Sequence, residues 1–298
     1  MFHFLRKLIY SRNLNLIVRN ILWPIKKILP NKFKIPVNGI VNVVLGNNIL
    51  KFTANETSPM LKELFWNYNN CNFEFSNILI DLVRNSNTFF DIGSNIGYYS
   101  IIAKKANPNL NIFAFEPSNG PYHYLKENIN LNKMHDIHAI KMAVGNENIV
   151  LDFYEDINPK FKYLKYHVSG TGNTQNTWNN QQTNRYSIEC VTVDNFVEEY
   201  KISSVDVMKI DTEATEDKVL LGALNTIIKF QPIIICEVLP NKIEEQIFKI
   251  INNLEYSIFK HIEETDTLKL VHNFTADDNR NYIFAPKSKF ELINKFIE

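Results

Sequence analysis

Short apolar segments alternate with segments of helical spacing along most of this chain, and that alternation restricts its fold more than any other feature. The expected strands cover 88–92, 111–116, 137–144, 205–211, 232–238 and 256–261, with two more near 268–272 and 281–285. The expected helices cover 97–106, 118–132, 214–229 and 241–254. Strands that alternate with helices favour a mostly parallel sheet covered by helices on both faces. Ligands of such sheets bind beyond the carboxyl ends of the strands.

The first 60 residues are expected to form an extension before a domain at 61–298. Residues 1–55 contain nine of the 32 Lys and Arg residues and none of the 32 Asp and Glu residues. Apolar residues within 1–29 recur mainly at helical spacing, and 38–54 has the pattern of a hairpin. The basic helix either lies on an anionic membrane or packs its apolar stripe on the body as a cap. Its charge suggests an anionic partner, which is a lipid headgroup, a phosphorylated substrate or nucleic acid.

The stretch FFDIGSNIGYY at 89–99 is typical of a strand, a glycine turn and the start of a helix, a unit that holds a nucleotide in many proteins. The turn has neither the GxGxxG spacing of dinucleotide folds nor the lysine of a P-loop. Asp91 lies at the strand tip, where its carboxylate would repel a pyrophosphate and attract a cation. S-adenosylmethionine carries two cationic groups and no phosphate, so it fits this turn better than NAD does. Gly93 and Gly97 would let the backbone approach the ligand closely.

The end of the next strand supplies a second carboxylate. Glu116 follows Asp91 by 25 residues, and an acidic residue at that place can accept hydrogen bonds from the two hydroxyls of a ribose. Pro117 then ends the strand. Ala143, within the Met-Ala-Val run at 142–144, is expected to pack against an adenine ring. Together these positions predict a nucleoside site.

Two further carboxylates, Asp211 and Glu237, come at the ends of later strands, and their tips should face the same crevice. Either one could accept the proton of a hydroxyl nucleophile, and the pair has the oxygen ligands that Mg²⁺ prefers. Lys209 is the expected partner of Glu237, because a carboxylate in so apolar a strand needs one. Glu216 and Asp217 are interpreted as residues that stabilise a helix start.

A polar segment at 157–185 interrupts the alternation, and a loop of that length is usually functional or disordered. Its Tyr163, Tyr166 and Trp178 are expected either to stack on a sugar ring or to pin the loop to the body. His167 is interpreted as a solvated residue, with a role as a base or a substrate contact as the alternative.

From residue 88 to about 240 the chain resembles the FkbM-type methyltransferases, a family of S-adenosylmethionine-dependent enzymes. The resemblance rests on FFDIGSNIGYYS, on FAFEPSN with LKENINLN, on VTVDNF, and on VDVMKIDTEATEDKVLLGA followed by PIIICEV. It implies a Rossmann-like class I methyltransferase fold, with a seven-stranded sheet and one reversed strand, and transfer usually to oxygen. Members of the family often act in glycan, glycolipid or polyketide pathways. Ala214 departs from the family, which has glycine there, and this affects the role expected for Glu213.

The resemblance also implies roles for single residues. The methionine part of the cofactor would be bound by Asp91, Gly93, Asn95 and Gly97. Glu116 would bind the ribose. The acceptor side would be lined by Asp211, Glu213 and Glu237.

The sequence therefore predicts an S-adenosylmethionine-dependent methyltransferase that acts on a hydroxyl of a sugar, glycan or lipid-linked precursor. Three widely spaced cysteines and the lack of a bilayer-length apolar run indicate a cytoplasmic protein. If the basic N-terminus lies on a membrane and is not a cap, the expected contact is peripheral and at the inner membrane face. Neither a nucleic-acid partner nor a metal site is predicted. Two alternatives stay open: an NAD-dependent sugar-modifying oxidoreductase, and a non-catalytic membrane- or RNA-associated nucleoside-binding protein.

Overall fold

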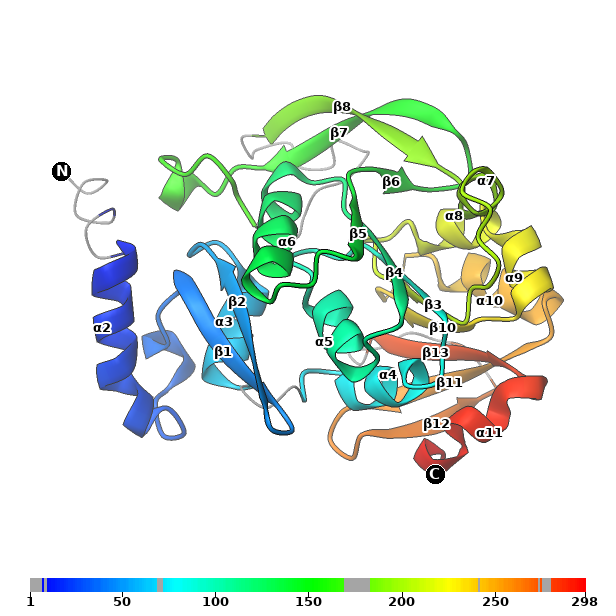
Figure 1. Cartoon of the computed structure of the whole chain (residues 1–298), viewed down its shortest axis with the longest axis horizontal. Coiled ribbons are helices and arrows are strands. Elements are labelled where there is room, and N and C mark those ends of the chain that lie inside the picture. The colour runs from blue at the N-terminus through cyan, green and yellow to red at the C-terminus, as the bar shows by residue number, and fades with distance from the viewer. Residues whose placement is uncertain are drawn as a thin grey trace.

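The computed structural model describes residue 7 and residues 10–68, 72–168, 183–240, 242–272, 274 and 280–298. Within these residues eight strands form the central sheet (Figure 1). In spatial order they are β12 (Thr267–Val271), β11 (Tyr256–Ile262), β13 (Asn281–Pro286), β10 (Ile233–Glu237), β9 (Val207–Ile210), β3 (Thr88–Ile92), β4 (Asn111–Phe115) and β5 (Ile137–Ile140). The strands from β10 to β5 are parallel, whereas β13 runs antiparallel to both of its neighbours.

This sheet confirms the expected α/β fold and its reversed strand. The seven strands from β11 to β5 include β13 as the one reversed member. β12 adds an eighth strand at the edge, because a short turn returns the chain beside β11 as an antiparallel hairpin. The strand that the residue pattern predicts near 268–272 is confirmed. The resemblance implies seven strands, which is one fewer than the described sheet contains.

Helices cover both faces of the sheet because its central strands are apolar on both sides. Phe89 and Phe90 are both fully buried, yet they belong to two different apolar clusters, since neighbouring residues of a strand point to opposite faces. The Phe89 face is covered by α4 (Ser76–Val83), α5 (Tyr98–Ala106), α6 (Asn119–Leu131) and α11 (Phe290–Ile293). The Phe90 face is covered by α7 (Val193–Glu199), α8 (Glu216–Leu221), α9 (Leu224–Phe230) and α10 (Glu244–Asn253).

The helix expected at 214–229 is divided into α8 and α9. Gly222 ends α8, and a Cβ atom there would lie 2.0 Å from the carbonyl oxygen of Gly145. The helix therefore ends at Gly222, where its backbone packs directly against the backbone of Gly145. The expectation of one continuous helix was wrong because this contact comes from a distant segment.

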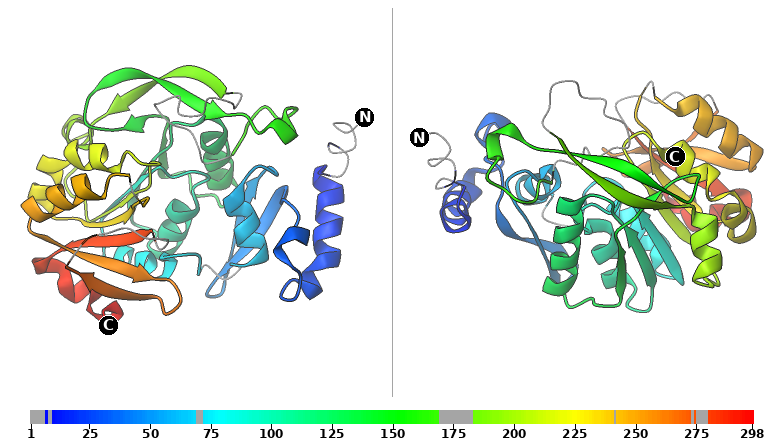
Figure 2. Two further views of the ribbon diagram at one scale, coloured as in Figure 1. Left: turned by 180° about the vertical axis from the view of Figure 1, so that it is seen from behind. Right: turned by 90° about the horizontal axis from the view of Figure 1, so that it is seen from above.

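The strand expected at 137–144 is also divided, between two sheets. β5 stays in the central sheet, while β6 (Ala143–Val144) pairs with β8 (Thr183–Val191). β8 in turn pairs with β7 (Ile149–Asp156), so that the described residues contain a second, three-stranded sheet. Seen from above, the long ribbon of β7 and β8 crosses over the central sheet (Figure 2).

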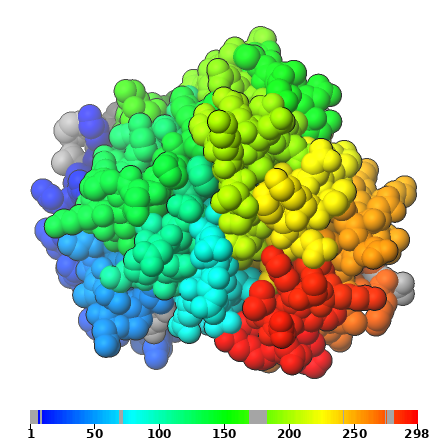
Figure 3. Space-filling model, turned by 45° about the vertical axis from the view of Figure 1, so that its right-hand side comes forward, coloured from blue at the N-terminus to red at the C-terminus, as the bar shows by residue number. Residues whose placement is uncertain are grey.

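The N-terminal segments lie on the side of the molecule away from the C-terminal segments (Figures 1 and 3). They comprise α2 (Arg12–Leu22), the hairpin of β1 (Gly39–Leu45) and β2 (Asn48–Ala54), and α3 (Pro59–Trp66). Phe52 on the inner side of the hairpin belongs to the same apolar cluster as residues of α5. The division of the chain at residue 60 stays a prediction.

Short 3-10 helices complete the described structure, at Trp23–Ile25, Asn31–Phe33, Pro159–Phe161, Lys287–Lys289 and Asn294–Phe296. None of the helices in the described ranges is long and apolar enough to cross a bilayer.

Candidate active site

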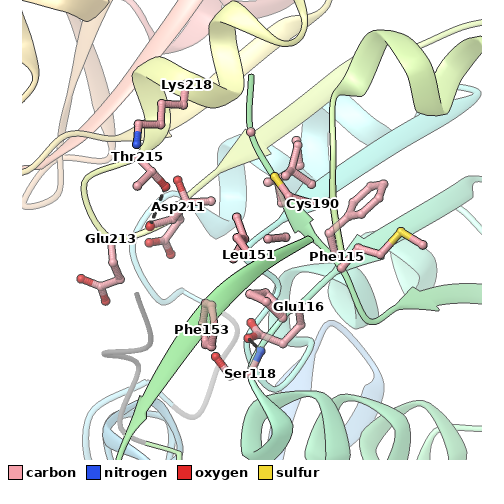
Figure 4. Close-up of a pocket in the computed structure, with 18 of the residues that line it drawn as sticks. Phe115, Glu116, Ser118, Leu151, Phe153, Cys190, Asp211, Glu213, Thr215 and Lys218 are labelled. Atoms are coloured by element: carbon pink, nitrogen blue, oxygen red, sulfur yellow. Dashed lines mark hydrogen bonds between the residues drawn. The ribbon is translucent and has the colours of Figure 1, made fainter. Parts of the chain in front are cut away.

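A cavity of about 330 Å³ opens beyond the carboxyl ends of β3, β4 and β9, where the sequence analysis places the ligand. The loop after β3, the end of β4, and the loop after β9 form its floor and sides, and β6 and β7 of the small sheet close it. Figure 4 shows Glu116 on one side of this cavity and Asp211 and Glu213 on the other. The cavity thus has carboxylates on two opposite sides.

Glu116 follows β4 directly and is held by two backbone donors. Its Oε2 accepts a hydrogen bond from the Asn95 amide and its Oε1 accepts one from the Ser118 amide, each at 2.8 Å. Burial raises the pKa of Glu116 to about 7, although both amides act in the opposite direction. A carboxylate has about four acceptor positions, so this one can still accept hydrogen bonds from a ligand.

An apolar wall lies between the two acidic sides. Ala143 contributes to it together with its neighbours at 142–144, and Pro117 also lines the cavity. Leu151 and Phe153 of β7 complete the wall and were not among the expected site residues. Their alternation along an extended segment is the signal that could have identified them. Such a wall suits a flat aromatic ring.

The glycine turn supports the cavity from two positions. Gly93 lines the cavity, and its φ is +76°. A Cβ atom at Gly93 would lie 1.8 Å from the carbonyl oxygen of Asp211, so glycine is needed for the tips of β3 and β9 to meet. Gly97 caps the start of α5 with a φ of +83°, and its Cβ would lie 2.5 Å from a methyl group of Leu125. Gly93 therefore allows a close approach of two backbone segments, and Gly97 allows a side chain of α6 to pack against the start of α5.

Asp91 lies behind the cavity wall. It is fully buried, accepts a hydrogen bond from the Ser100 hydroxyl at 2.6 Å, and is not among the described residues that line the cavity. Burial raises the pKa of Asp91, against the opposing effects of Lys209 and Ser100. The structure thus places Asp91 and Gly97 outside the cavity, and Gly93, Asn95, Glu116, Pro117 and Ala143 on its surface.

Lys209 joins the tips of β3 and β9. Its ammonium donates to the Gly93 carbonyl oxygen at 2.8 Å and to Asp211 Oδ2 at 3.0 Å, and lies 3.8 Å from Asp91 Oδ1. Burial alone would lower the pKa of Lys209, but Asp211 and Asp91 outweigh it and raise that pKa. The expected pairing of Lys209 with Glu237 was wrong, because the basic group that lies beside Glu237 is Arg280, at 3.8 Å.

Asp211, Glu213 and Glu237 come together with a fourth carboxylate, that of Glu74. Asp211 borders both the large cavity and a smaller one of about 20 Å³, which Glu74 and Glu237 also line. Burial, and then the charge of Asp211 and a hydrogen bond with it, raise the pKa of Glu237 well above its usual range. Burial also raises the pKa values of Glu213 and Glu74 to about 7. Burial and mutual repulsion thus favour the protonated forms of these carboxylates.

Glu74 was missed by the sequence analysis. It precedes α4 within the tripeptide Phe73–Phe75, has a φ of +46°, and accepts a hydrogen bond from the Tyr99 hydroxyl at 2.5 Å. No motif includes it, and a carboxylate between two phenylalanines is the only sequence signal that marks it. Its place beside Asp211 depends on contacts between distant segments.

The turn between β9 and α8 has an unusual backbone. Glu213 and Ala214 have φ values of +59° and +70°, a region that glycine adopts most easily. Glu216 is buried and accepts hydrogen bonds from the amide and hydroxyl groups of Thr212, so it stabilises this turn, as its interpretation as a helix-start residue requires. Ala214, the departure from the family pattern, therefore occupies a position where glycine would be less strained.

The polar loop contributes no residue to the cavity within its described part. His167 is buried, and its Nδ1 accepts a hydrogen bond from the Asn158 amide, so its interpretation as a solvated residue was wrong. Tyr163 donates to Glu56, and the ring of Tyr166 stacks on His123 at a centroid distance of 4.2 Å. These tyrosines pin the loop to the body. Trp178 lies outside the described residues.

No group of three or more His, Cys, Asp or Glu side chains with the geometry of a metal site occurs in the described ranges. Cys190 and Cys236 are free and buried.

Comparisons with known proteins point to one family. Residues 91–272 match the family described as Methyltransferase FkbM domain. Methyltransferase 1 of Beauveria bassiana (strain ARSEF 2860) is 26% identical over 142 residues, which are 44% of this chain and 56% of that relative. The match thus spans little more than half the length of the curated relative.

Two solved structures are similar at low identity. The methyltransferase FkbM from Methylobacillus flagellatus KT is 13% identical, with a TM-score of 0.43, over 67% of this chain and 43% of that chain. A SAM-dependent O-methyltransferase from Thermotoga maritima is 11% identical, with a TM-score of 0.37, over 71% of this chain and 63% of that chain.

Proposed function

The chain belongs to the FkbM methyltransferase family, and we propose from this premise that it transfers a methyl group from S-adenosylmethionine to a hydroxyl of a sugar, glycan or lipid-linked precursor. The observation that carries the proposal is the position of Asp211. Its carboxylate borders the large cavity on one side and the smaller acidic cavity on the other, and Lys209 holds it in place. A base at the junction of a cofactor site and an acceptor site is what transfer to a hydroxyl requires.

The residues of the large cavity fit S-adenosylmethionine. Asn95 lines the cavity, and its buried Oδ1 has no hydrogen-bond partner among the described residues, so it can accept one from the ligand. Glu116 would accept hydrogen bonds from the ribose hydroxyls, and the wall that includes Ala143 and Phe153 would hold the adenine. Gly93 and Asn95 would bind the methionine part. The cofactor supplies a methyl group made electrophilic by a positively charged sulfur.

Asp211 would act as the general base. A hydroxyl is a weak nucleophile, and proton transfer to a positioned carboxylate contributes roughly 10²–10⁴-fold to the rate of such a reaction. As the new carbon–oxygen bond formed and the carbon–sulfur bond broke, the hydroxyl proton would pass to Asp211. Glu237, whose protonated form is favoured by burial and by its hydrogen bond with Asp211, would accept a hydrogen bond from another hydroxyl of the acceptor and orient it.

The acidic surroundings favour oxygen over nitrogen as the methylated atom. The charge of Asp211, together with the ionised forms of Glu74 and Glu213, would attract an ammonium group and raise its pKa, which keeps an amine protonated and removes its nucleophilic lone pair. A hydroxyl is neutral and is not affected in this way. Several acceptor oxygens at short range also match the many hydroxyl donors of a sugar.

The test is transfer of a radiolabelled methyl group from S-adenosylmethionine to glucosides and to the matched glucosaminides. We expect label on the glucosides, and a decrease of roughly 10²–10⁴-fold in turnover for Asp211→Asn. Calorimetric titration should show that Asp211→Asn still binds S-adenosylhomocysteine within about threefold of wild type, because Asp211 acts on the acceptor. Glu245→Gln, at an exposed carboxylate of α10, is the matched control.

Three results would contradict the proposal: unchanged turnover in Asp211→Asn, label confined to the amino groups, or binding of NAD in place of S-adenosylhomocysteine. The last result would move the assignment to the oxidoreductase alternative.

A further inference from the structure

Helix α2 contacts the body with polar side chains and presents apolar side chains to solvent. Asn15 and Arg19 are 0% and 1% exposed, whereas Ile17 and Ile21 are 55% and 68% exposed. This is the reverse of the arrangement that a structural cap requires, in which the apolar stripe would be buried. α2 lies at the rim of the molecule, with the hairpin between it and the rest of the fold (Figures 1 and 2).

Specific contacts hold α2 in this orientation. Asn15 Nδ2 donates to the Pro36 carbonyl oxygen at 2.9 Å, and Asn15 Oδ1 accepts from the Asn38 amide at 2.9 Å. Arg19 Nη2 donates to the Ile40 carbonyl oxygen at 3.4 Å, and its guanidinium lies 4.8 Å from the centre of the Phe65 ring. Burying a guanidinium costs free energy. The helix thus keeps its isoleucines outward although burying them would be favourable.

The exposed apolar residues continue beyond the end of α2. Five of them recur at helical spacing and form what we call the outer apolar face, namely Leu14, Ile17, Ile21, Ile25 and Ile28. Ile28 is 81% exposed. Exposed apolar residues grouped on one segment of a folded protein indicate an interaction site.

Basic residues accompany the outer apolar face. Arg12, Lys27 and Lys32 are exposed, and the Lys26 ammonium lies 3.8 Å from the centre of the Trp23 ring. The first 55 residues contain no acidic residue. An apolar helix face with lysine, arginine and tryptophan beside it is the composition of helices that lie in the interface of an anionic bilayer.

We propose that the outer apolar face docks this protein on an anionic lipid bilayer. The isoleucines enter the boundary between headgroups and acyl chains, and the lysines and arginines contact the anionic headgroups. A second copy of this chain fits the face less well, because two segments with nine basic residues each would repel one another. The inference does not depend on the proposed methyl transfer.

Flotation with vesicles tests the proposal on the full chain. We expect binding to vesicles of phosphatidylcholine mixed with phosphatidylglycerol, weaker binding to phosphatidylcholine alone, and a decrease in binding as salt is added. The double variant Ile17→Asp with Ile21→Asp should bind at least roughly tenfold more weakly. Each replacement removes the favourable free energy of moving an isoleucine side chain from water into the bilayer. Lys27→Glu with Lys32→Glu should lose the preference for phosphatidylglycerol.

The matched control is Leu221→Asp with Ile228→Asp. These residues are 44% and 65% exposed on α8 and α9, away from the outer apolar face, and their replacement should change binding less than about twofold. Circular dichroism and thermal unfolding of each variant check that the fold is intact, as expected for exposed positions.

Two outcomes would overturn the proposal. The first is a lack of binding to phosphatidylglycerol vesicles, or equal binding by wild type and the Ile17→Asp with Ile21→Asp variant. The second is a dimer, detected by light scattering, that the same variant abolishes, since the face would then be an interface between two copies.

Discussion

At the scale of single residues, the surroundings of each carboxylate decide what it can do. Glu116 receives two amide donors and keeps acceptor positions for a ligand. Glu216 uses Oε1 to hold the turn after β9. Glu237 faces Asp211, and burial and that charge together favour its protonated form. The same type of side chain is thus suited to ligand binding, to a structural role or to proton transfer according to its neighbours.

The pKa of Glu116 leads to a prediction about pH. This pKa is about 7 in the free protein, and a ligand whose hydroxyls donate to the carboxylate favours its ionised form. Binding should therefore lower the pKa and release a proton, and the affinity for S-adenosylhomocysteine should rise as the pH increases through about 7. Calorimetry in two buffers of different ionisation enthalpy measures the proton release.

Glu116→Gln cannot ionise, so its affinity should be lower and should depend less on pH. An identical pH dependence in Glu116→Gln and wild type would exclude Glu116 as the source. Glu245→Gln serves again as the exposed control, with a pH dependence like that of wild type.

Ala214 leads to a prediction about stability. Because its φ is +70°, replacement by glycine removes a clash of Cβ with the backbone, and we expect Ala214→Gly to stabilise the fold by about 1 kcal/mol. The same change within helix α5, Ala103→Gly, should destabilise by about 1 kcal/mol or more. Urea unfolding of both variants measures the two signs, and a destabilised Ala214→Gly would show that its methyl group makes a compensating contact.

At the scale of elements, the junction between β3 and β9 positions the site. Lys209 bonds the Gly93 carbonyl oxygen, and the Gly93 Cα lies against the Asp211 carbonyl, so the two strand tips are held on each other. This junction places Asp211 beside the loop that carries Asn95. The candidate base and the candidate cofactor site are thus fixed by one packing contact between two elements.

Gly93→Ala and Gly46→Ala test this junction as a matched pair. Both glycines have positive φ values, +76° and +55°, but a Cβ at Gly46, in the hairpin turn, would meet no atom of the described residues within 4 Å. Gly46→Ala should cost only the backbone strain, about 1 kcal/mol. Gly93→Ala adds a backbone collision and should cost at least about 3 kcal/mol or prevent folding. If denaturant unfolding shows equal losses of stability for the two variants, the tips of β3 and β9 can move apart to accommodate the added methyl group.

At the scale of the whole molecule, the N-terminal hairpin is attached to the body through α6. Asn128 is fully buried, and its side chain accepts from the Thr53 amide and donates to the carbonyl oxygens of Thr53 and Ile96. Asn132, one turn later and more exposed, makes the same pair of bonds with Lys51. Two asparagines, one within α6 and one at its C-terminal end, thus hydrogen-bond to the backbone of β2.

Replacing each asparagine by alanine should show how firmly the hairpin is attached. Asn128→Ala leaves buried backbone groups without partners and should cost about 2–4 kcal/mol. Asn132→Ala should cost less than about 1 kcal/mol, because water can reach the groups that it leaves. Urea unfolding followed by fluorescence and by circular dichroism measures both. Similar losses for the two variants would contradict the burial argument.

The sequence by itself determined the features that depend on near neighbours in the chain. The spacing of apolar residues predicts the alternating strands and helices, and the places of Gly93, Glu116 and Asp211 at the ends of strands bring them to one edge of a parallel sheet. This follows because parallel strands share one carboxyl edge. The sequence was therefore enough for the fold class, the family and the location of the cavity.

The tertiary structure decided what depends on contacts between distant segments. Glu74 lies beside Asp211, and Lys209 pairs with Asp91 and Asp211. Asp91 lies behind the wall of the cavity and does not line it. In α2, Arg19 is buried and the isoleucines are exposed. Spacing along the chain states which residues share a face, but it does not state which face is covered. Burial and charge pairing arise only when the elements pack, and they decide which carboxylates hold protons and which apolar face stays exposed.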